Sequence, residues 1–193
     1  YNARNTAIEM LKDRGYTVPI EIECNRITDF RPMYSKKQYD IEVDNPTKCY
    51  VKFILHTKVR PNNIRDLVSQ IRDTSDTTEN KDINDNIIIV IKNKPNSTLK
   101  KLTKEFKGIQ IFWIKLLVIN ITKNKLNPTF IKITEPEIED LLTKLKLQSR
   151  QQLPLMLKDD PNSLYFNCST GNVCKVVSNS ITNGEYVSYR CIK

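Results

Sequence analysis

An uninterrupted run of apolar residues, IIIVI at positions 87–91, places the strongest constraint on how this chain folds. A strand with one face in water alternates apolar and polar residues, whereas this run contains no polar position. Both faces of the strand must therefore be covered by other parts of the protein. Polar residues flank the run on both sides, so it predicts a central β-strand packed between two layers.

Helical and extended patterns alternate around this run. Segments with apolar residues at helical spacing are 3–11, 64–71 and 99–106. Segments with strand character are 39–43, 49–56 and 109–115, and the alternation at 18–22 suggests an extended segment or a strand. Strands that alternate with helices around a buried central strand are typical of an α/β domain. We therefore predict an α/β domain over residues 1–118, with a central sheet flanked by helices.

The pattern changes after about residue 118. Thr134 followed by Glu137 is a capping-box sequence, and Pro136 suits the first turn of the helix that it starts. Further on, Asn183-Gly184 separates two β-branched runs, which is typical of a β-hairpin. We expect a second, small α+β domain over 119–193 that carries this hairpin.

The composition argues against several kinds of site. No apolar run reaches the ~18–20 residues of a membrane helix, and the 4 glycines are isolated, so no glycine-rich phosphate loop exists. No two of the 5 cysteines form a C-x-x-C pair, and the chain has 1 histidine, His56. The close pairs of ligands that zinc sites use are therefore missing. We therefore expect no metal site, no cofactor and no membrane partner, and we interpret the cysteines as reduced and buried.

A metal-dependent nuclease is an enzymatic alternative. Such sites place an Asp and then an acid-x-Lys pair on adjacent strands, so that two carboxylates hold the metal and the lysine activates water. Asp40 and Lys52 have this spacing, but Tyr50 stands where the second carboxylate belongs. Glu42 or Asp44 would have to supply it.

One segment of the chain is especially rich in lysine. The chain has 31 Lys plus Arg against 22 Asp plus Glu, a net charge of +9, although an A+T-rich genome also enriches lysine. The densest cluster is KNKPNSTLKKLTKEFK at 92–107, and its candidate contacts are Lys92, Lys94, Pro95, Ser97, Lys100 and Lys101. Lysines at a helix start suit phosphate oxygens. The cluster predicts either contact with a nucleic-acid backbone, without base readout, or only a solvated helix face.

Motifs in the C-terminal part follow one another in the order of a known family. They are LLVINITKNKLNP (116–128), LLTKLKL (141–147), Leu153-Pro154, Asp160-Pro161, G-x-V-x-K (171–175) and S-x-T-x-G-x-Y-x-x-Y-R (180–190). This series resembles the assembly domain of the fifth subunit shared by nuclear RNA polymerases, a family that has an archaeal branch. DRGY (13–16), and IIIVI followed by a Pro-x-Ser turn, are similar to the N-terminal jaw domain of that subunit.

The resemblance implies a non-catalytic subunit of a DNA-dependent RNA polymerase, with no catalytic residues of its own. The jaw would have a restriction-endonuclease-like fold without the metal chemistry, and its lysine cluster would approach downstream duplex DNA. The C-terminal domain would dock on the largest subunit within the polymerase complex. Its candidate contacts are Leu153, Pro154, Asp160, Pro161, Lys175, Thr182, Gly184, Tyr189 and Arg190.

Departures from the family pattern indicate a divergent lineage. Ser169 and Thr170 replace a basic pair, and Ser178 replaces an arginine. Together with the composition, this fits a large DNA virus or an A+T-rich protist. The implied location is the nucleus, or the virion or a cytoplasmic factory for a viral protein. Besides the nuclease, a free-standing DNA-binding protein that uses the lysine cluster alone stays an alternative.

Overall fold

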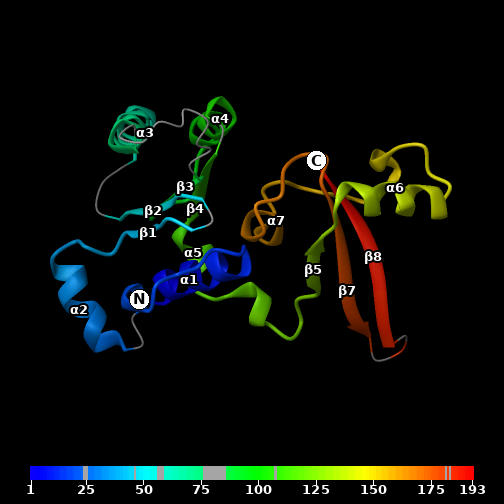
Figure 1. Ribbon diagram of the computed structural model, residues 1–193, viewed down its shortest axis with the longest axis horizontal. Coiled ribbons are helices and arrows are strands. Elements are labelled where there is room, and N and C mark those ends of the chain that lie inside the picture. Colours follow the sequence, from blue (N-terminus) through cyan, green and yellow to red (C-terminus); the bar gives the residue numbers. More distant parts are fainter. Residues whose placement is uncertain are drawn as a thin grey trace. The chain divides into compact units, whose positions relative to one another are not determined.

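The computed structural model describes residues 1–23, 26–45, 47–55, 59–75, 86–106, 108–180, 182 and 184–193. The chain forms two compact units, Tyr1–Ile119 and Asn120–Lys193, and each contains its own four-stranded sheet (Figure 1). The expected mixture of helices and sheets is confirmed. Over the described residues, no helix combines the length and the apolar character needed to cross a bilayer.

The sheet of the first unit has the strand order β1-β2-β3-β4. The antiparallel pair at one edge joins β1 (Ile41–Val43) to β2 (Cys49–Ile54). β3 (Asn86–Ile91) pairs parallel with β2 on one side and with β4 (Ile109–Trp113) on the other. Residues 87–91 of β3 are at most 2% exposed, so the predicted central strand is confirmed.

Helices cover both faces of this sheet (Figure 1). One face carries α3 (Pro61–Ser75) and α4 (Ser97–Glu105), whose apolar residues share a core with Ile87, Ile89 and Ile91 of β3. The other face carries α1 (Asn2–Asp13) with α5 (Ile114–Leu117) packed beside it. Because each face of β3 has its own apolar layer, neither face tolerates a polar residue.

Three segments of the first unit differ from the expectation, and one of them is α5, which begins at Ile114 inside the predicted strand 109–115. At 18–22, where an extended segment or a strand was expected, Ile20–Ile22 instead form a 3-10 helix, η1, in which Ile20 is 83% exposed. The buried guanidinium of Arg4 donates a hydrogen bond to the Ile22 carbonyl at 2.7 Å. This carbonyl is therefore paired with a side chain and not with the backbone of a neighbouring strand. The third segment, α2 (Ile27–Ser35), is a helix that the sequence pattern did not indicate.

The sheet of the second unit has the order β5-β7-β8-β6. β7 (Val173–Ser180) and β8 (Gly184–Ile192) form the predicted antiparallel hairpin. At the edges, β5 (Thr129–Lys132) pairs with β7 and the short β6 (Leu155–Met156) pairs with the end of β8. The remaining elements of this unit are α6 (Glu135–Lys144), α7 (Pro161–Tyr165) and the 3-10 helices η2 (Ile121–Lys123) and η3 (Arg150–Gln152).

Two apolar clusters lie in this second unit. The larger joins Ile138 and Leu141 of α6 to Val173 and Cys191 of the hairpin. The smaller consists of Met156, Cys168, Cys174 and Ile192. Val173 and Cys174 are consecutive strand residues and therefore point to opposite faces of the sheet. The hairpin thus has an apolar cluster on each face near the end where β8 meets β6.

Truncation of the central strand should destabilise the first unit. Ile89→Ala removes a fully buried side chain, and we expect a loss of about 2–5 kcal/mol in the free energy of unfolding. Ile20→Ala, at the 83% exposed position, should change it by less than about 0.5 kcal/mol. The fluorescence of Trp113, the only tryptophan, reports the urea unfolding of this unit. Equal effects would contradict the inner position of β3.

Candidate nucleic-acid and partner interfaces

The residues predicted to contact DNA lie where β3 ends and α4 begins, and we refer to them as the lysine surface. Of these residues, Lys92, Lys94, Ser97 and Lys101 are exposed, whereas Pro95 and Lys100 are half-buried. They come from one continuous segment, 92–101, so the fold keeps them together. The side chains of Lys104 and Lys107 fall outside the described part of the structure.

The backbone of the lysine surface is anchored from several directions. The Asn96 Oδ1 accepts a hydrogen bond from the Leu99 N–H at 2.9 Å and caps α4. The Lys92 carbonyl accepts one from the Trp113 indole N–H at 3.0 Å, and Leu99 is buried in the core. The lysine side chains therefore extend from a backbone that is held in place.

The electrostatics of α4 favour an anion near its start. The first turn of α4 contains no acidic residue, so the positive end of the helix dipole adds to the charge of the lysines. The acidic residue of the segment, Glu105, lies at the other end of the helix and pairs with Arg65 at 3.2 Å. The arrangement can therefore attract phosphate oxygens.

The candidate nuclease residues form an internal ion pair. Asp40 Oδ2 lies 2.9 Å from Lys52 Nζ, and Asp40 Oδ1 accepts a hydrogen bond from the Phe53 N–H at 2.9 Å. Glu42 faces Tyr50 across the β1–β2 ladder. Over the described residues, no three His, Cys, Asp or Glu side chains gather where they could hold a metal ion. This geometry favours a structural role for Asp40. His56 lies outside the described residues.

The thiols in the described part of the chain are buried. They are Cys49, Cys168, Cys174 and Cys191. Burial raises the pKa of Cys49 to about 11 and also raises the pKa of Cys191. The contact with the Cys168 sulfur, at 3.5 Å, and burial together raise the pKa of Cys174. These three thiols therefore stay protonated near neutral pH, which makes them poor nucleophiles and metal ligands. Cys24 lies outside the described residues.

Some of the candidate partner-binding residues hold the second unit together. Leu153 is 5% exposed and belongs to its larger apolar cluster. The Pro154 carbonyl accepts a hydrogen bond from the Cys191 N–H at 2.9 Å. Asp160 Oδ1 accepts one from the Asn162 N–H at 3.0 Å, which starts α7 at Pro161. These contacts fix β6 and α7 in place.

The remaining candidates lie on the hairpin. Thr182 and Arg190 are exposed, whereas Lys175 and Tyr189 are half-buried and face each other across the β7–β8 ladder. Gly184 has φ +65°, a backbone conformation that glycine adopts without strain. Tyr189 packs against the larger cluster, while Tyr186 is 55% exposed, because residues three apart on a strand point to opposite faces of the sheet. The hairpin thus presents polar and aromatic groups together.

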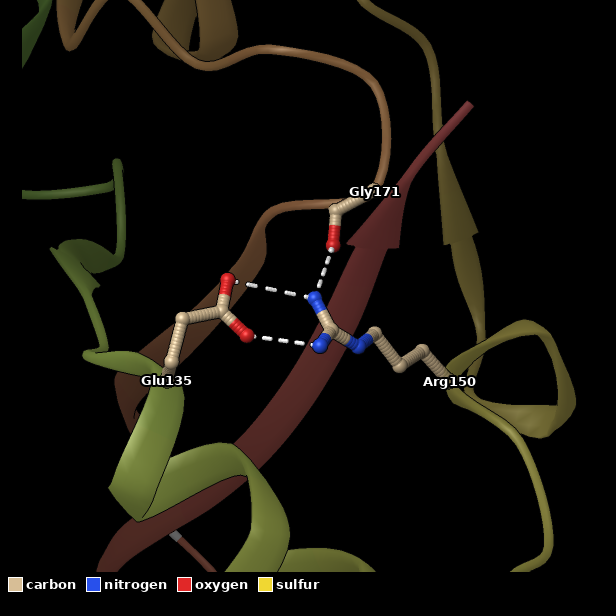
Figure 2. Close-up of polar contacts among 3 residues, drawn as sticks. All are labelled: Glu135, Arg150 and Gly171. Atoms are coloured by element: carbon tan, nitrogen blue, oxygen red, sulfur yellow. Dashed lines mark hydrogen bonds and ion pairs between the residues drawn. The ribbon is translucent and has the colours of Figure 1, made fainter.

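An arginine clamp in the second unit was not predicted from the sequence. The Arg150 guanidinium donates two parallel hydrogen bonds to Glu135, from Nη2 to Oε2 at 2.6 Å and from Nη1 to Oε1 at 3.2 Å (Figure 2). The same Nη1 also donates to the Gly171 carbonyl at 3.4 Å. The three residues are far apart in sequence, so no local pattern indicates them. The clamp ties the start of α6 to η3 and to the segment that leads into β7.

Comparison with known proteins gives matches over the whole chain. The family model described as the C-terminal domain of RNA polymerase Rpb5 matches residues 119–192. A Dictyostelium discoideum protein named subunit rpabc1 of DNA-directed RNA polymerases I, II and III is 31% identical over 97% of this chain and 93% of its own length. A protein of Arabidopsis thaliana named subunit 5B of DNA-directed RNA polymerases IV and V is 28% identical over 100% of this chain and 88% of its own length.

The capping box of α6 gives a pH-dependent prediction. The Thr134 N–H and hydroxyl donate to Glu137 Oε2 and lower the pKa of that carboxyl from 4.5. A lowered folded-state pKa contributes stability above the unfolded-state pKa and loses it as the pH falls through the folded value. Glu137→Ala should therefore lower the melting temperature at neutral pH, and the difference from the parent should shrink below about pH 4.5.

Circular dichroism melts from neutral pH to about pH 3 check this, because that range spans ordinary carboxyl pKa values. Glu139→Ala, at another exposed position of α6, serves as the control and should change the melting temperature little at any pH. A difference between Glu137→Ala and the parent that grows on acidification would contradict the capping role.

The arginine clamp should show a measurable coupling energy. A double-mutant cycle with Arg150→Ala and Glu135→Ala should give about 0.5–1 kcal/mol, the upper part of the range for exposed ion pairs. Arg150→Lys should keep only part of it, since an ammonium group cannot make two parallel bonds to one carboxylate. Urea unfolding followed by circular dichroism measures the cycle. Additive single effects would show that the clamp contributes nothing.

Proposed function

Since the chain belongs to the RNA polymerase Rpb5 family, we propose that it docks through its second unit on the largest polymerase subunit and presents its first unit to downstream DNA. The observation that carries the proposal is the similarity to a named polymerase subunit over 97% of the chain. The chain is in this view a non-catalytic part of the transcription machinery. Its Rpb5 domain is the assembly domain, and the α/β unit is the jaw.

The second unit has the properties of a docking module. The family match at 119–192 coincides with the compact unit Asn120–Lys193. Its hairpin exposes Thr182, Tyr186 and Arg190, and aromatic and arginine side chains are enriched in protein interfaces. In the proposal, Lys175, Thr182, Tyr189 and Arg190 meet the partner. Leu153, Pro154, Asp160, Pro161 and Gly184 set the shape of the surface.

The first unit supplies contacts to nucleic acid. A polymerase moves over every sequence, so a subunit beside its DNA path benefits from phosphate contacts and would be hindered by base-specific ones. The lysine surface offers the first kind of contact. We propose that Lys92, Lys94, Ser97, Lys100 and Lys101 approach the backbone of downstream duplex DNA, with Pro95 shaping the turn between them. We also propose that this unit has a restriction-endonuclease-like fold.

The location follows from the partner. A polymerase subunit of a cell works in the nucleus, and a viral one works in the virion or in a cytoplasmic factory.

The Asp40–Lys52 ion pair weighs against the nuclease alternative, because the chain itself engages both carboxylate oxygens of Asp40.

Co-purification tests the assembly role. The tagged chain, recovered from its native source, should bring down the two largest polymerase subunits in near-equal amounts. Removing 120–193 should abolish the recovery, and Arg190→Glu should reduce it severalfold, since the exposed guanidinium would become a carboxylate in the interface. Replacing Lys92, Lys94, Lys100 and Lys101 with glutamine should leave the recovery unchanged. Recovery of the tagged chain alone would contradict the proposal.

A free-standing DNA-binding protein makes a different prediction from a jaw. The isolated chain would then bind duplex DNA tightly, with a steep dependence on salt. A jaw makes few phosphate contacts, so the isolated chain should bind weakly and with a shallow salt slope. Duplex affinity at two salt concentrations separates the two.

A further inference from the structure

A solvent-open hollow of about 350 Å³ lies beside the lysine surface in the first unit. Two segments far apart in the sequence line it. The first includes Arg60, and the second includes Ile91, Lys92, Lys94, Asn96 and Leu99. The first segment leads into α3, and the second runs from the end of β3 into α4. We refer to it as the basic hollow.

The position of the basic hollow follows from the sheet topology. β2 and β3 run parallel, so their carboxyl ends lie at the same edge of the sheet, and the two lining segments follow these ends. The carboxyl ends of parallel strands thus bring together two connections that are far apart in the sequence. The volume lies at the low end of the ~300–1,000 Å³ found for small-molecule sites, which is enough for a small polar group.

The charge of the hollow has one sign. Arg60, Lys92 and Lys94 line it, and the described residues of its wall include no carboxylate. In the part of the chain that the structure describes, none of these three cations forms an ion pair. Three like charges around one hollow repel each other, and an anion between them removes that repulsion. The hollow therefore favours an anionic ligand.

The walls strengthen this preference. Ile91 is 2% and Leu99 5% exposed, so an apolar core lies behind the charged rim, and a low-dielectric wall concentrates the field of the cations. The Oδ1 of Asn96 caps α4, which leaves the NH₂ group of that side chain as a donor. Arg60 adds a planar fork of N–H groups, which matches two oxygens of one phosphate.

We propose that the basic hollow seats one phosphate group, held by the Arg60 fork and by the charges of Lys92 and Lys94. The proposal rests on the proposed function in one respect, since the phosphate in the assembled polymerase belongs to the backbone of downstream duplex DNA. A free phosphate ion has the same chemistry. Lys100 and Lys101 do not line the hollow, so the lysine surface divides into residues that hold a phosphate and residues that only add charge.

Arg60 is the new residue in this site. It lies outside the basic segment 92–107 and is brought to that segment only by the fold of β2, α3 and β3. A matched comparison is available because Lys101 is also exposed, belongs to the same lysine surface and does not line the hollow. Arg60→Gln and Lys101→Gln remove the same charge, so total charge cannot explain a difference between them.

The experiment uses the full chain, labelled with ¹⁵N, in two separate titrations. One adds inorganic phosphate against chloride at equal ionic strength, and the other adds a short duplex DNA of random sequence. Amide shifts at 91–99 report occupancy of the hollow, and fits to them give the dissociation constants. The variants are Arg60→Gln, Arg60→Lys and Lys101→Gln, and their melting temperatures must equal that of the parent.

We expect both ligands to shift these amides. Arg60→Gln should weaken duplex binding about eightfold at 0.1 M salt, the effect of losing one phosphate contact. Lys101→Gln should weaken duplex binding less than Arg60→Gln does, because Lys101 approaches the DNA without lining the hollow. Arg60→Lys should lie between them because it keeps the charge without the fork.

The remaining outcomes separate the phosphate site from the proposed contact with DNA. If phosphate shifts the amides in an Arg60-dependent way and the duplex does not bind, the phosphate site stands and the proposed DNA contact fails. If Arg60→Gln and Lys101→Gln weaken binding equally, net charge is the cause, and the site is overturned. It is likewise overturned if neither ligand moves the amides at 91–99.

Discussion

The parallel pairing of β3 with a strand on each side, between two apolar layers, is the interaction on which the first unit depends. Ile87, Ile89 and Ile91 meet α3 and α4 on one face. Ile88 and Val90, at most 1% exposed, belong to the other face. Parallel neighbours cannot be joined by a tight turn, so crossovers that contain α3 and α4 connect β2 to β3 and β3 to β4. Those helices begin at one edge of the sheet and thereby determine where the charged connections lie.

That edge is where the basic groups of the unit converge. The connection after β3 brings Lys92 and Lys94, and the connection before α3 brings Arg60. The buried residues Ile91 and Leu99 fix the backbone behind them. Stability and the proposed DNA contact therefore share one cause, since the apolar strand that holds the sheet together also positions the cations at its end.

The second unit is held together in a different way. Its hairpin has small apolar clusters on both faces, and polar contacts fix the elements around it. Arg150 ties α6 to the segment before β7, the capping box starts α6, and Asp160 starts α7. Because these contacts occupy one end of the hairpin, the residues toward the turn, such as Tyr186, stay exposed. This combination of a fixed frame and an exposed surface suits the proposed docking role.

The sequence alone determined the central strand, the hairpin and the start of α6, because apolar periodicity, Asn-Gly and the capping box act over a few neighbouring residues. Motif order also pointed to the polymerase family, and the comparisons bear this out. The segment at 18–22 looked like a strand, yet its backbone bonds to Arg4, a partner that no local pattern reveals. The tertiary structure alone decided the Arg150 clamp and the place of Arg60 beside Lys92, since each joins residues that only the packed sheets bring together.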